Sequence, residues 1–143
     1  MRYESLHLFI ILFCQKIQRN SEKTYGRESD DRIMTDKVVV FSTCASAEEA
    51  GRVARALVEK RLAACVNVLP GVRSVYRWKD AIEDEEEVLL LIKTSRPLME
   101  ELRGEIERLH SYEVPEVIAL AVVDGSERYL AWMNRELAHK PSL

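Results

Sequence analysis

The sequence predicts an α+β domain, in which a four-stranded antiparallel sheet carries two helices on one face and is followed by a further helix. Three observations support this prediction. Segments typical of strands and helices alternate in the order βαββαβ over residues 37–123. Both halves of that stretch repeat the order strand, helix, strand, and a long hairpin joins them. Two interleaved right-handed βαβ units form the ferredoxin-like sandwich, whose second sheet face is left to the last helix or to another subunit.

The first half begins with a strand and an amphipathic helix. Residues 38–43 (VVVFST) form an apolar, β-branched run typical of a buried strand. Ser46 and Glu49 match the S-x-x-E capping box that begins many helices. Behind the box, apolar residues recur at the helical spacing i, i+3, i+4, i+7, i+8: Ala50, Val53, Ala54, Leu57 and Val58.

The hairpin at the centre of the chain is predicted from two arms of different pattern. A strand over 63–69 is bent or interrupted by Pro70-Gly71. Residues 72–78 then alternate with a period of two. One side of this arm presents Val72, Ser74, Tyr76 and Trp78, and the other presents Arg73, Val75 and Arg77. The return arm, 88–92, is apolar at every position, which indicates that both of its faces are covered.

Between the arms, residues 79–86 are polar and acidic, with Asp80 at a turn position. The acidic run 83–87 is expected to be a solvated turn, because it lacks the alternating oxygen ligands of a calcium loop. An isolated two-stranded hairpin is marginally stable in water. The arms are therefore expected to pair with strands of this chain or of a neighbouring subunit.

The second half repeats the pattern of the first. Pro97 is placed near the start of a helix, and Pro115 marks the stretch where the helix has ended. The apolar stripe of this helix is Leu98, Leu102, Ile106 and Leu109. A fourth strand is predicted over 117–123, followed by a turn at Asp124-Gly125. Ser126 is expected to cap a last helix with Tyr129, Leu130, Met133 and Leu137 on one side.

Composition restricts the class of protein. A chain of 143 residues fits one folded domain, and its net charge of −3 gives no basic face for a nucleic acid. The three cysteines, Cys14, Cys44 and Cys65, form no CxxC pair and no zinc-type spacing with histidines. An odd number of cysteines argues against a disulfide framework and favours a reducing compartment, so we expect a cytoplasmic protein.

Residues 1–33 differ from the rest and are expected to be disordered or a leader. The apolar run LHLFIILF (6–13) is far shorter than the roughly 20 residues that cross a bilayer, and residues 15–33 are polar without periodicity. Two interpretations of this segment remain open: it is either an over-extended start or leader, or an export or anchor segment. The folded domain, 34–143, is expected to have no contact with a membrane.

Four stretches together resemble a known family. LAACVNVLPGVRSVYRW (62–78), EVLLLIKT (87–94), HSYEVPEV (110–117) and GSERYLAWM (125–133) are similar in order and spacing to CutA divalent-cation tolerance proteins. The resemblance covers about residues 37–138. It implies a ferredoxin-like fold and tight homotrimers whose long hairpins reach neighbouring subunits. It also implies a link to copper and other divalent cations, with no established reaction. Asp80 stands where the family often has glycine, and Ser111 replaces the proline of a His-Pro-Tyr motif.

Candidate metal ligands follow from the residue types and this resemblance. Cys65 is either a soft ligand suited to copper or a small buried apolar residue. His110, with Glu113 and Glu116 close by, is either part of a mixed nitrogen and oxygen site or a helix-end histidine bonded locally. Cys44 follows the first strand beside a helix N-terminus, which either lowers its pKa or leaves it structural. The expected cofactor is Cu²⁺ or another divalent cation.

Candidate cleft and interface residues form a second set. Glu87 and Lys93 lie an even number of residues apart on one strand, and therefore on one face. They are expected either to share an intersubunit cleft or to form an ion-pair set that fixes strand register. The cleft would also contain Tyr76, Trp78 and Tyr112, while Val75, Tyr129 and Trp132 would pack at the seam of the trimer.

These patterns favour a homotrimer that binds divalent metal ions without catalysis. The alternative is a signalling trimer, similar to PII proteins, that binds a small anion in intersubunit clefts through Lys93 and Arg73. An enzyme is not expected, since no Ser-His-Asp arrangement and no Gly-rich phosphate loop can be assigned. An RNA-binding domain of the same fold would need exposed aromatic residues on a basic sheet, which this acidic chain does not offer.

Overall fold

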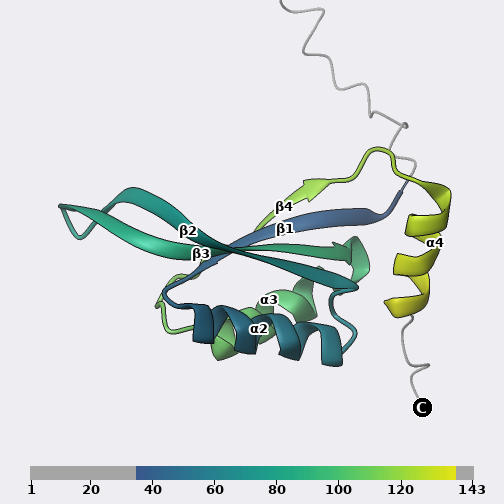
Figure 1. Ribbon diagram of the computed structural model, residues 1–143, viewed down its shortest axis with the longest axis horizontal. Helices are drawn as coiled ribbons and strands as arrows, with labels where there is room; N and C mark the ends of the chain where they lie inside the picture. Colours follow the sequence, from purple (N-terminus) through teal and green to yellow (C-terminus); the bar gives the residue numbers. More distant parts are fainter. Residues whose placement is uncertain (1–34, 138–143) are drawn as a thin grey trace, which may run out of the picture. The chain divides into compact units, whose positions relative to one another are not determined.

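A computed structural model describes residues 35–137. The expected extension 1–33, together with Met34 and residues 138–143, lies outside the described residues. Four strands form one antiparallel sheet in the order β2-β3-β1-β4 (Figure 1). Their bounds are Lys37–Cys44 for β1, Cys65–Trp78 for β2, Ala81–Ser95 for β3 and Ile118–Ala121 for β4. This order confirms the predicted ferredoxin-like fold.

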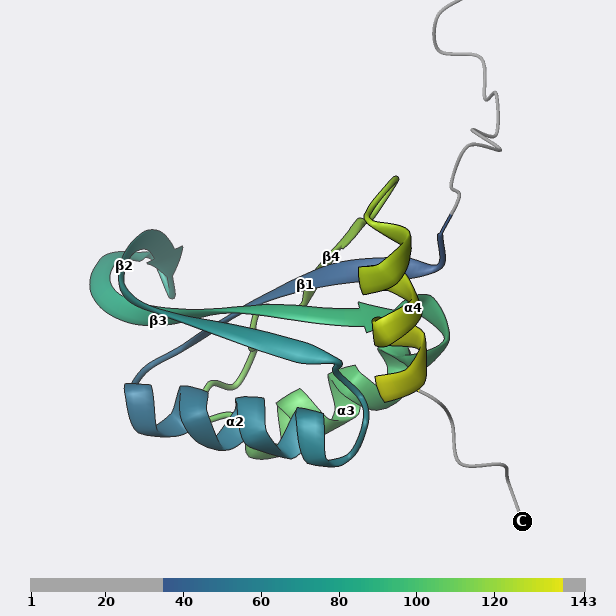
Figure 2. The same ribbon diagram turned by 45° about the vertical axis from the view of Figure 1, so that its right-hand side comes forward.

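Helices α2 (Ala47–Glu59) and α3 (Met99–Leu109) cover one face of the sheet (Figures 1 and 2). A short 3-10 turn, Arg96–Leu98, precedes α3 and contains the expected Pro97. The core lies between these helices and the sheet, and its largest fully buried side chains include Leu57, Leu90, Ile92, Leu102 and Ile106. Burying a side chain of this size contributes about 1.5–3 kcal/mol each. None of the described helices is long and apolar enough to cross a membrane.

The capping box predicted at the start of α2 is only half formed. Ser46 Oγ accepts a hydrogen bond from Glu49 N at 3.1 Å, as expected of an N-cap. The Glu49 carboxylate does not return the bond to Ser46. It accepts from Ala45 N at 3.2 Å, and it is almost fully buried. Glu49 therefore faces the interior at the junction of β1 and α2.

The hairpin turn is much tighter than the sequence suggested. Lys79 and Asp80 both adopt positive φ, at 46° and 67°, and β3 begins at Ala81. Two central residues with positive φ are characteristic of the short turns that match the twist of a hairpin. The expectation of a polar turn over 79–86 was therefore wrong, and so was the solvated acidic turn. The acidic run 83–87 lies in β3, where it pairs with β2.

Pro70 and Gly71 do not interrupt β2 but form a bulge in it. Leu69 pairs with Leu89, yet Val72 pairs with Glu87, so one extra residue is accommodated. Gly71 has φ +77°, a conformation that glycine adopts without strain. Because successive side chains of a strand alternate between faces, the extra residue reverses which side chains of β2 point to each face.

The face of the sheet away from α2 and α3 is called the open face below, and the described residues 35–137 cover it only at one end. Helix α4 (Glu127–Glu136) packs Met133 and the following Leu137 against Ala64 and Leu98. It begins after Ser126 as predicted, but the Ser126 side chain makes no cap hydrogen bond. Strand β4 is shorter than the predicted 117–123. Its side chains Ile118 and Leu120 are each 54% exposed.

Candidate functional site

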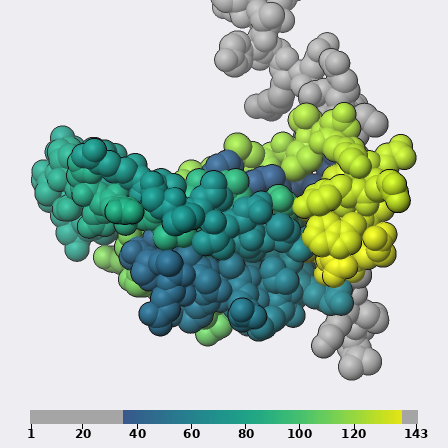
Figure 3. Space-filling view, in the orientation of Figure 1, coloured from purple at the N-terminus to yellow at the C-terminus, as the bar shows by residue number. Residues whose placement is uncertain are grey.

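A pocket of about 550 Å³ lies between the hairpin and the segment that leads from α3 to β4. The bulge in β2 turns Tyr76 and Trp78 to the same face as Glu87 of β3. Residues 111–116 close the other side. Three aromatic and three acidic side chains dominate the lining: Tyr76, Trp78, Tyr112, Glu87, Glu113 and Glu116. Beyond the pocket, the hairpin projects past α2 (Figure 3).

Glu87 is the buried charge of this pocket. It is only 4% exposed, and its Oε1 accepts a hydrogen bond from the Tyr112 hydroxyl at 2.7 Å. Burial raises the pKa of Tyr112, and the bond to Glu87 raises it further. Burial, with the nearby charge of Glu87, also raises the pKa of Glu116. The pocket is therefore an electronegative site with aromatic walls.

Lys93 shares the open face with Glu87, as predicted, but not the pocket. The two lie six residues apart on β3, which corresponds to roughly 20 Å along a strand. Lys93 Nζ lies 3.8 Å from Cys65 Sγ and 3.4 Å from the Tyr129 hydroxyl. Four of the five expected cleft residues thus line one pocket, and Lys93 belongs to a separate group near α4.

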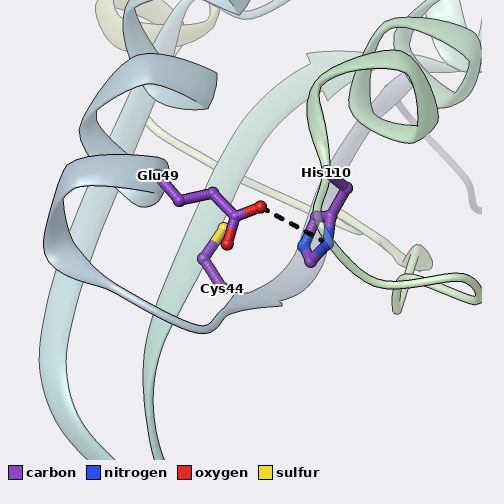
Figure 4. A group of neighbouring side chains, drawn as sticks. All are labelled: Cys44, Glu49 and His110. Atoms are coloured by element: carbon purple, nitrogen blue, oxygen red, sulfur yellow. Dashed lines mark ion pairs between the residues drawn. The ribbon is translucent and has the colours of Figure 1, made fainter.

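A second cluster joins three side chains that could hold a metal ion: Cys44, Glu49 and His110 (Figure 4). Cys44 ends β1, Glu49 lies in the first turn of α2, and His110 follows α3 directly. One ligand atom from each lies within 4.8 Å of the others. Cys44 and the side chain of His110 are fully buried, and Glu49 is 4% exposed. The cluster is therefore buried inside the protein, next to Ser111.

Hydrogen bonds define the tautomer of His110. Its Nδ1 accepts from Tyr112 N at 3.0 Å, so this nitrogen carries a lone pair and no proton. The proton is then on Nε2, which donates to the Thr43 carbonyl at 2.7 Å. The ring is neutral in this arrangement, although Nδ1 lies 3.8 Å from Glu49 Oε1 (dashed in Figure 4).

Glu49 and Cys44 have opposite protonation preferences. Burial alone would raise the pKa of Glu49, but hydrogen bonds from Ser111 N (2.5 Å), Ser111 Oγ (3.1 Å) and Ala45 N outweigh it and lower the pKa. Burial raises the pKa of the Cys44 thiol to about 12, and the charges of Glu49 and Glu87 add to the shift. The alternative of a reactive Cys44 with a lowered pKa was therefore wrong, since burial outweighs the helix N-terminus.

Within one chain, the four expected metal ligands do not converge. Cys65 pairs with Lys93 of β3, whereas Cys44 pairs with Val88 of the same strand. Five residues separate these two partners, so Cys65 lies roughly 16 Å along the sheet from Cys44. Glu113 and Glu116 line the pocket, and only His110 belongs to the metal-type cluster.

Glu49 was considered only as a cap. It lies four residues before Val53, on the buried stripe of its own helix, and this periodicity is the signal that could have identified it.

Comparison with known proteins identifies the family to which this fold belongs. A family model described as "CutA1 divalent ion tolerance protein" matches residues 38–136, which is most of the chain. The chain belongs to the CutA family. The "Divalent-cation tolerance protein CutA" of Thermus thermophilus is 45% identical over 96 residues, covering 67% of this chain and 93% of that protein. Human "Protein CutA" is 48% identical over 95 residues, covering 66% of this chain and 53% of its own length.

Solved CutA structures share the fold. The Thermus thermophilus structure superposes with a TM-score of 0.66 at 45% identity, covering 67% of this chain and 93% of that chain. CutA1 of Oryza sativa superposes with a TM-score of 0.71 at 38% identity, covering 73% and 95%. The names of CutA relatives include a chloroplastic protein of Arabidopsis thaliana and a periplasmic one of Archaeoglobus fulgidus. Members of the CutA family therefore occupy different compartments.

Proposed function

We propose that this CutA protein is a non-catalytic homotrimer of a reducing, cytoplasmic compartment that binds a divalent metal cation, Cu²⁺ or Zn²⁺, at Cys44, Glu49 and His110. The observation that carries the proposal is the convergence of three different ligand atoms within 4.8 Å of one another. Thiolate and imidazole ligands suit copper and zinc better than magnesium or calcium. The family name, with its reference to divalent ions, agrees with this class of ligand.

The hydrogen bonds around His110 fit a metal ligand. Ligating histidines usually donate their second ring nitrogen to a carbonyl or carboxylate, which orients the ring. Nε2 of His110 already does so toward Thr43. Nδ1 is then the nitrogen available to a metal, after the Tyr112 N–H has moved away. This rearrangement is local, because both residues belong to one short segment.

The charges also fit. A Cys44 thiolate and a Glu49 carboxylate together carry two negative charges, which a divalent cation neutralises. Without the metal, the thiol keeps its proton because its pKa is raised to about 12. Metal binding must therefore release this proton, so that affinity rises with pH. A neutral complex is the form that a buried site tolerates best.

The proposal of a trimer is supported by large apolar and aromatic side chains that residues 35–137 leave partly exposed. Val75 on the hairpin is 63% exposed, and Trp78 and Tyr129 are 40% and 42% exposed. Trp132 is partly buried, with its ring 5.2 Å from that of Tyr129. Aromatic residues of this kind commonly anchor protein interfaces.

The alternative of an anion-binding, PII-like trimer has less support. The charged side chains that line the pocket are all carboxylates, and Lys93 does not lie there. Arg73 forms an ion pair with Asp84 on the other face of the hairpin. An anion in the pocket would therefore meet repulsion from Glu87 and its neighbours.

The metal proposal is tested by calorimetric titration of the full chain with Zn²⁺ and with Cu²⁺. The titrations are done anaerobically and without a reducing agent. We expect saturable binding of one ion per chain that Cys44→Ser weakens strongly. Cys65→Ser is the matched control and should bind as the wild type does. Equal binding by the Cys44→Ser variant, or loss of binding only in Cys65→Ser, would contradict the proposed site.

The proposed trimer is tested separately by equilibrium sedimentation of the metal-free full chain. A mass of three subunits at micromolar concentration is expected. A mass near one subunit would refute it and would leave the metal proposal untouched.

A further inference from the structure

The pocket under the hairpin has a chemical character that metal binding does not use. Its charged lining consists of Glu87, Glu113 and Glu116, and its walls include the rings of Tyr76, Trp78 and Tyr112. A volume of about 550 Å³ is in the range of small-molecule sites. The pocket is therefore large enough for an organic ligand and has the sign of charge that attracts a cation.

A metal ion is a poor fit for this pocket. Among residues 35–137, the group of metal-type ligand atoms that lies close enough to share an ion is Cys44, Glu49 and His110, and none of the pocket carboxylates belongs to it. Carboxylates that are spread around a cavity cannot coordinate one small ion. They can surround a larger cation whose charge is attached to an apolar body.

Glu87 supplies the specific point of attachment. The residue is 4% exposed and lines the pocket, and Tyr112 hydrogen-bonds to its Oε1. Among residues 35–137 no other group donates to the carboxylate, and Oε2 is not fully buried, so it is open to the pocket. A partly desolvated carboxylate is stabilised by a cation or a further donor that pairs with it. An ammonium group provides both the positive charge and the N–H donors.

The aromatic walls suit the rest of such a ligand. Ammonium groups and the methylene groups beside them are attracted to the faces of tryptophan and tyrosine rings. Lys79 already shows this attraction at the rim, where its Nζ lies 5.6 Å from the centre of the Trp78 ring. Val114 adds an exposed apolar surface on the opposite wall.

We infer that the pocket binds a small organic ammonium ion, a protonated primary amine on a short alkyl chain, with its ammonium group on Glu87 and its chain between Trp78 and Val114. This inference does not rest on the proposed metal site, which involves a different set of side chains. It would make the protein a receptor for an amine as well as for a metal.

The test is a calorimetric titration of the full chain, with chelator present, using three ligands of the same length. Butylammonium is the probe, and 1-butanol and butyrate are its neutral and anionic counterparts. We expect saturable binding of butylammonium and none of the other two. Equal binding of 1-butanol, or no saturable binding of butylammonium, would overturn the inference without any variant being needed.

Variants then locate the site. Glu87→Gln removes the charge with little change in shape and should weaken butylammonium binding by about tenfold or more, the usual loss for a hydrogen bond to a charged group. Glu86→Gln is the matched control, because Glu86 is exposed and points to the other face of β3. Cys44→Ser should abolish metal binding and leave amine binding intact. Unchanged affinity in a folded Glu87→Gln variant would overturn the inference.

Discussion

The ion cluster between α2 and α3 yields a prediction whose size can be worked out from the structure. Glu105 is 7% exposed and accepts hydrogen bonds from Arg108 Nη2 at 2.7 Å and Lys60 Nζ at 2.8 Å. The bonds from Arg108, and then those from Lys60, lower the pKa of Glu105 from 4.5 to about 2. A shift of this size corresponds to roughly 3 kcal/mol at about 1.4 kcal/mol per pKa unit.

That figure is an upper limit, because both cationic side chains are about half exposed to solvent. The side chains of Lys60 and Arg108 are 50% and 60% exposed, and water screens their attraction to the carboxylate. Exposed ion pairs contribute about 0–1 kcal/mol each. We therefore expect Glu105→Gln to lower the free energy of unfolding by about 1–2 kcal/mol at pH 7.

The lowered pKa of Glu105 determines how its contribution to stability changes with pH. The folded-state pKa is depressed, so the contribution of Glu105 is complete above its ordinary pKa of 4.5 and is lost as the pH falls toward about 2. The difference between wild type and Glu105→Gln should therefore shrink over this range. Urea unfolding at fixed protein concentration measures it, since subunit association would otherwise shift the apparent stability.

Glu107→Gln is the control, because Glu107 is an exposed residue of the same helix. It should change stability by only a few tenths of a kcal/mol at either pH. A Glu105→Gln penalty that equals that of Glu107→Gln, or one that persists unchanged down to pH 2, would refute the reasoning.

Four further outcomes are expected. Ser42→Ala should leave the free energy of unfolding unchanged or raise it by about 1 kcal/mol in urea, because the Ser42 hydroxyl is buried and has no hydrogen-bond partner among the described residues. Thr94→Val should lower the free energy of unfolding by about 1–3 kcal/mol, because Thr94 Oγ1 donates to the Leu62 carbonyl at 2.6 Å. Gly71→Ala should lower the thermal midpoint, because φ of +77° costs about 1 kcal/mol or more for alanine, although no atom lies in the way. Trp78→Ala should shift the sedimentation mass toward smaller species, and an unchanged mass would exclude Trp78 as an interface anchor.

The sequence was sufficient for the fold because its periodic patterns are local. The βαββαβ order, the buried face of α2 and the start of the last helix all depend on spacing within about ten residues. The turn was misjudged for a local reason as well. Acidic residues such as Glu85 and Glu86 are poor strand formers, but pairing with β2 on an exposed hairpin outweighs that preference.

The site was less accessible to sequence reasoning because it depends on contacts between distant segments. Tyr112 reaches Glu87 across 25 positions, and Ser111 reaches Glu49 across 62. Spacing along one strand correctly put Lys93 and Glu87 on one face, and the same six-residue spacing, roughly 20 Å, already implied that they lie too far apart to share one small pocket. His110 was identified as a ligand candidate from its residue type, its place at the end of a helix and the family resemblance, whereas its partners depend on where β1 ends and α2 begins.

The bulge at Pro70-Gly71 has an evolutionary consequence. With one residue deleted there, the bulge would disappear and the strand pairs on both sides would keep their partners, so that Val72 would still oppose Glu87, and Tyr76 and Trp78 would still face the pocket. CutA sequences can therefore differ by one residue in length at this point without a change in the side chains that line the pocket.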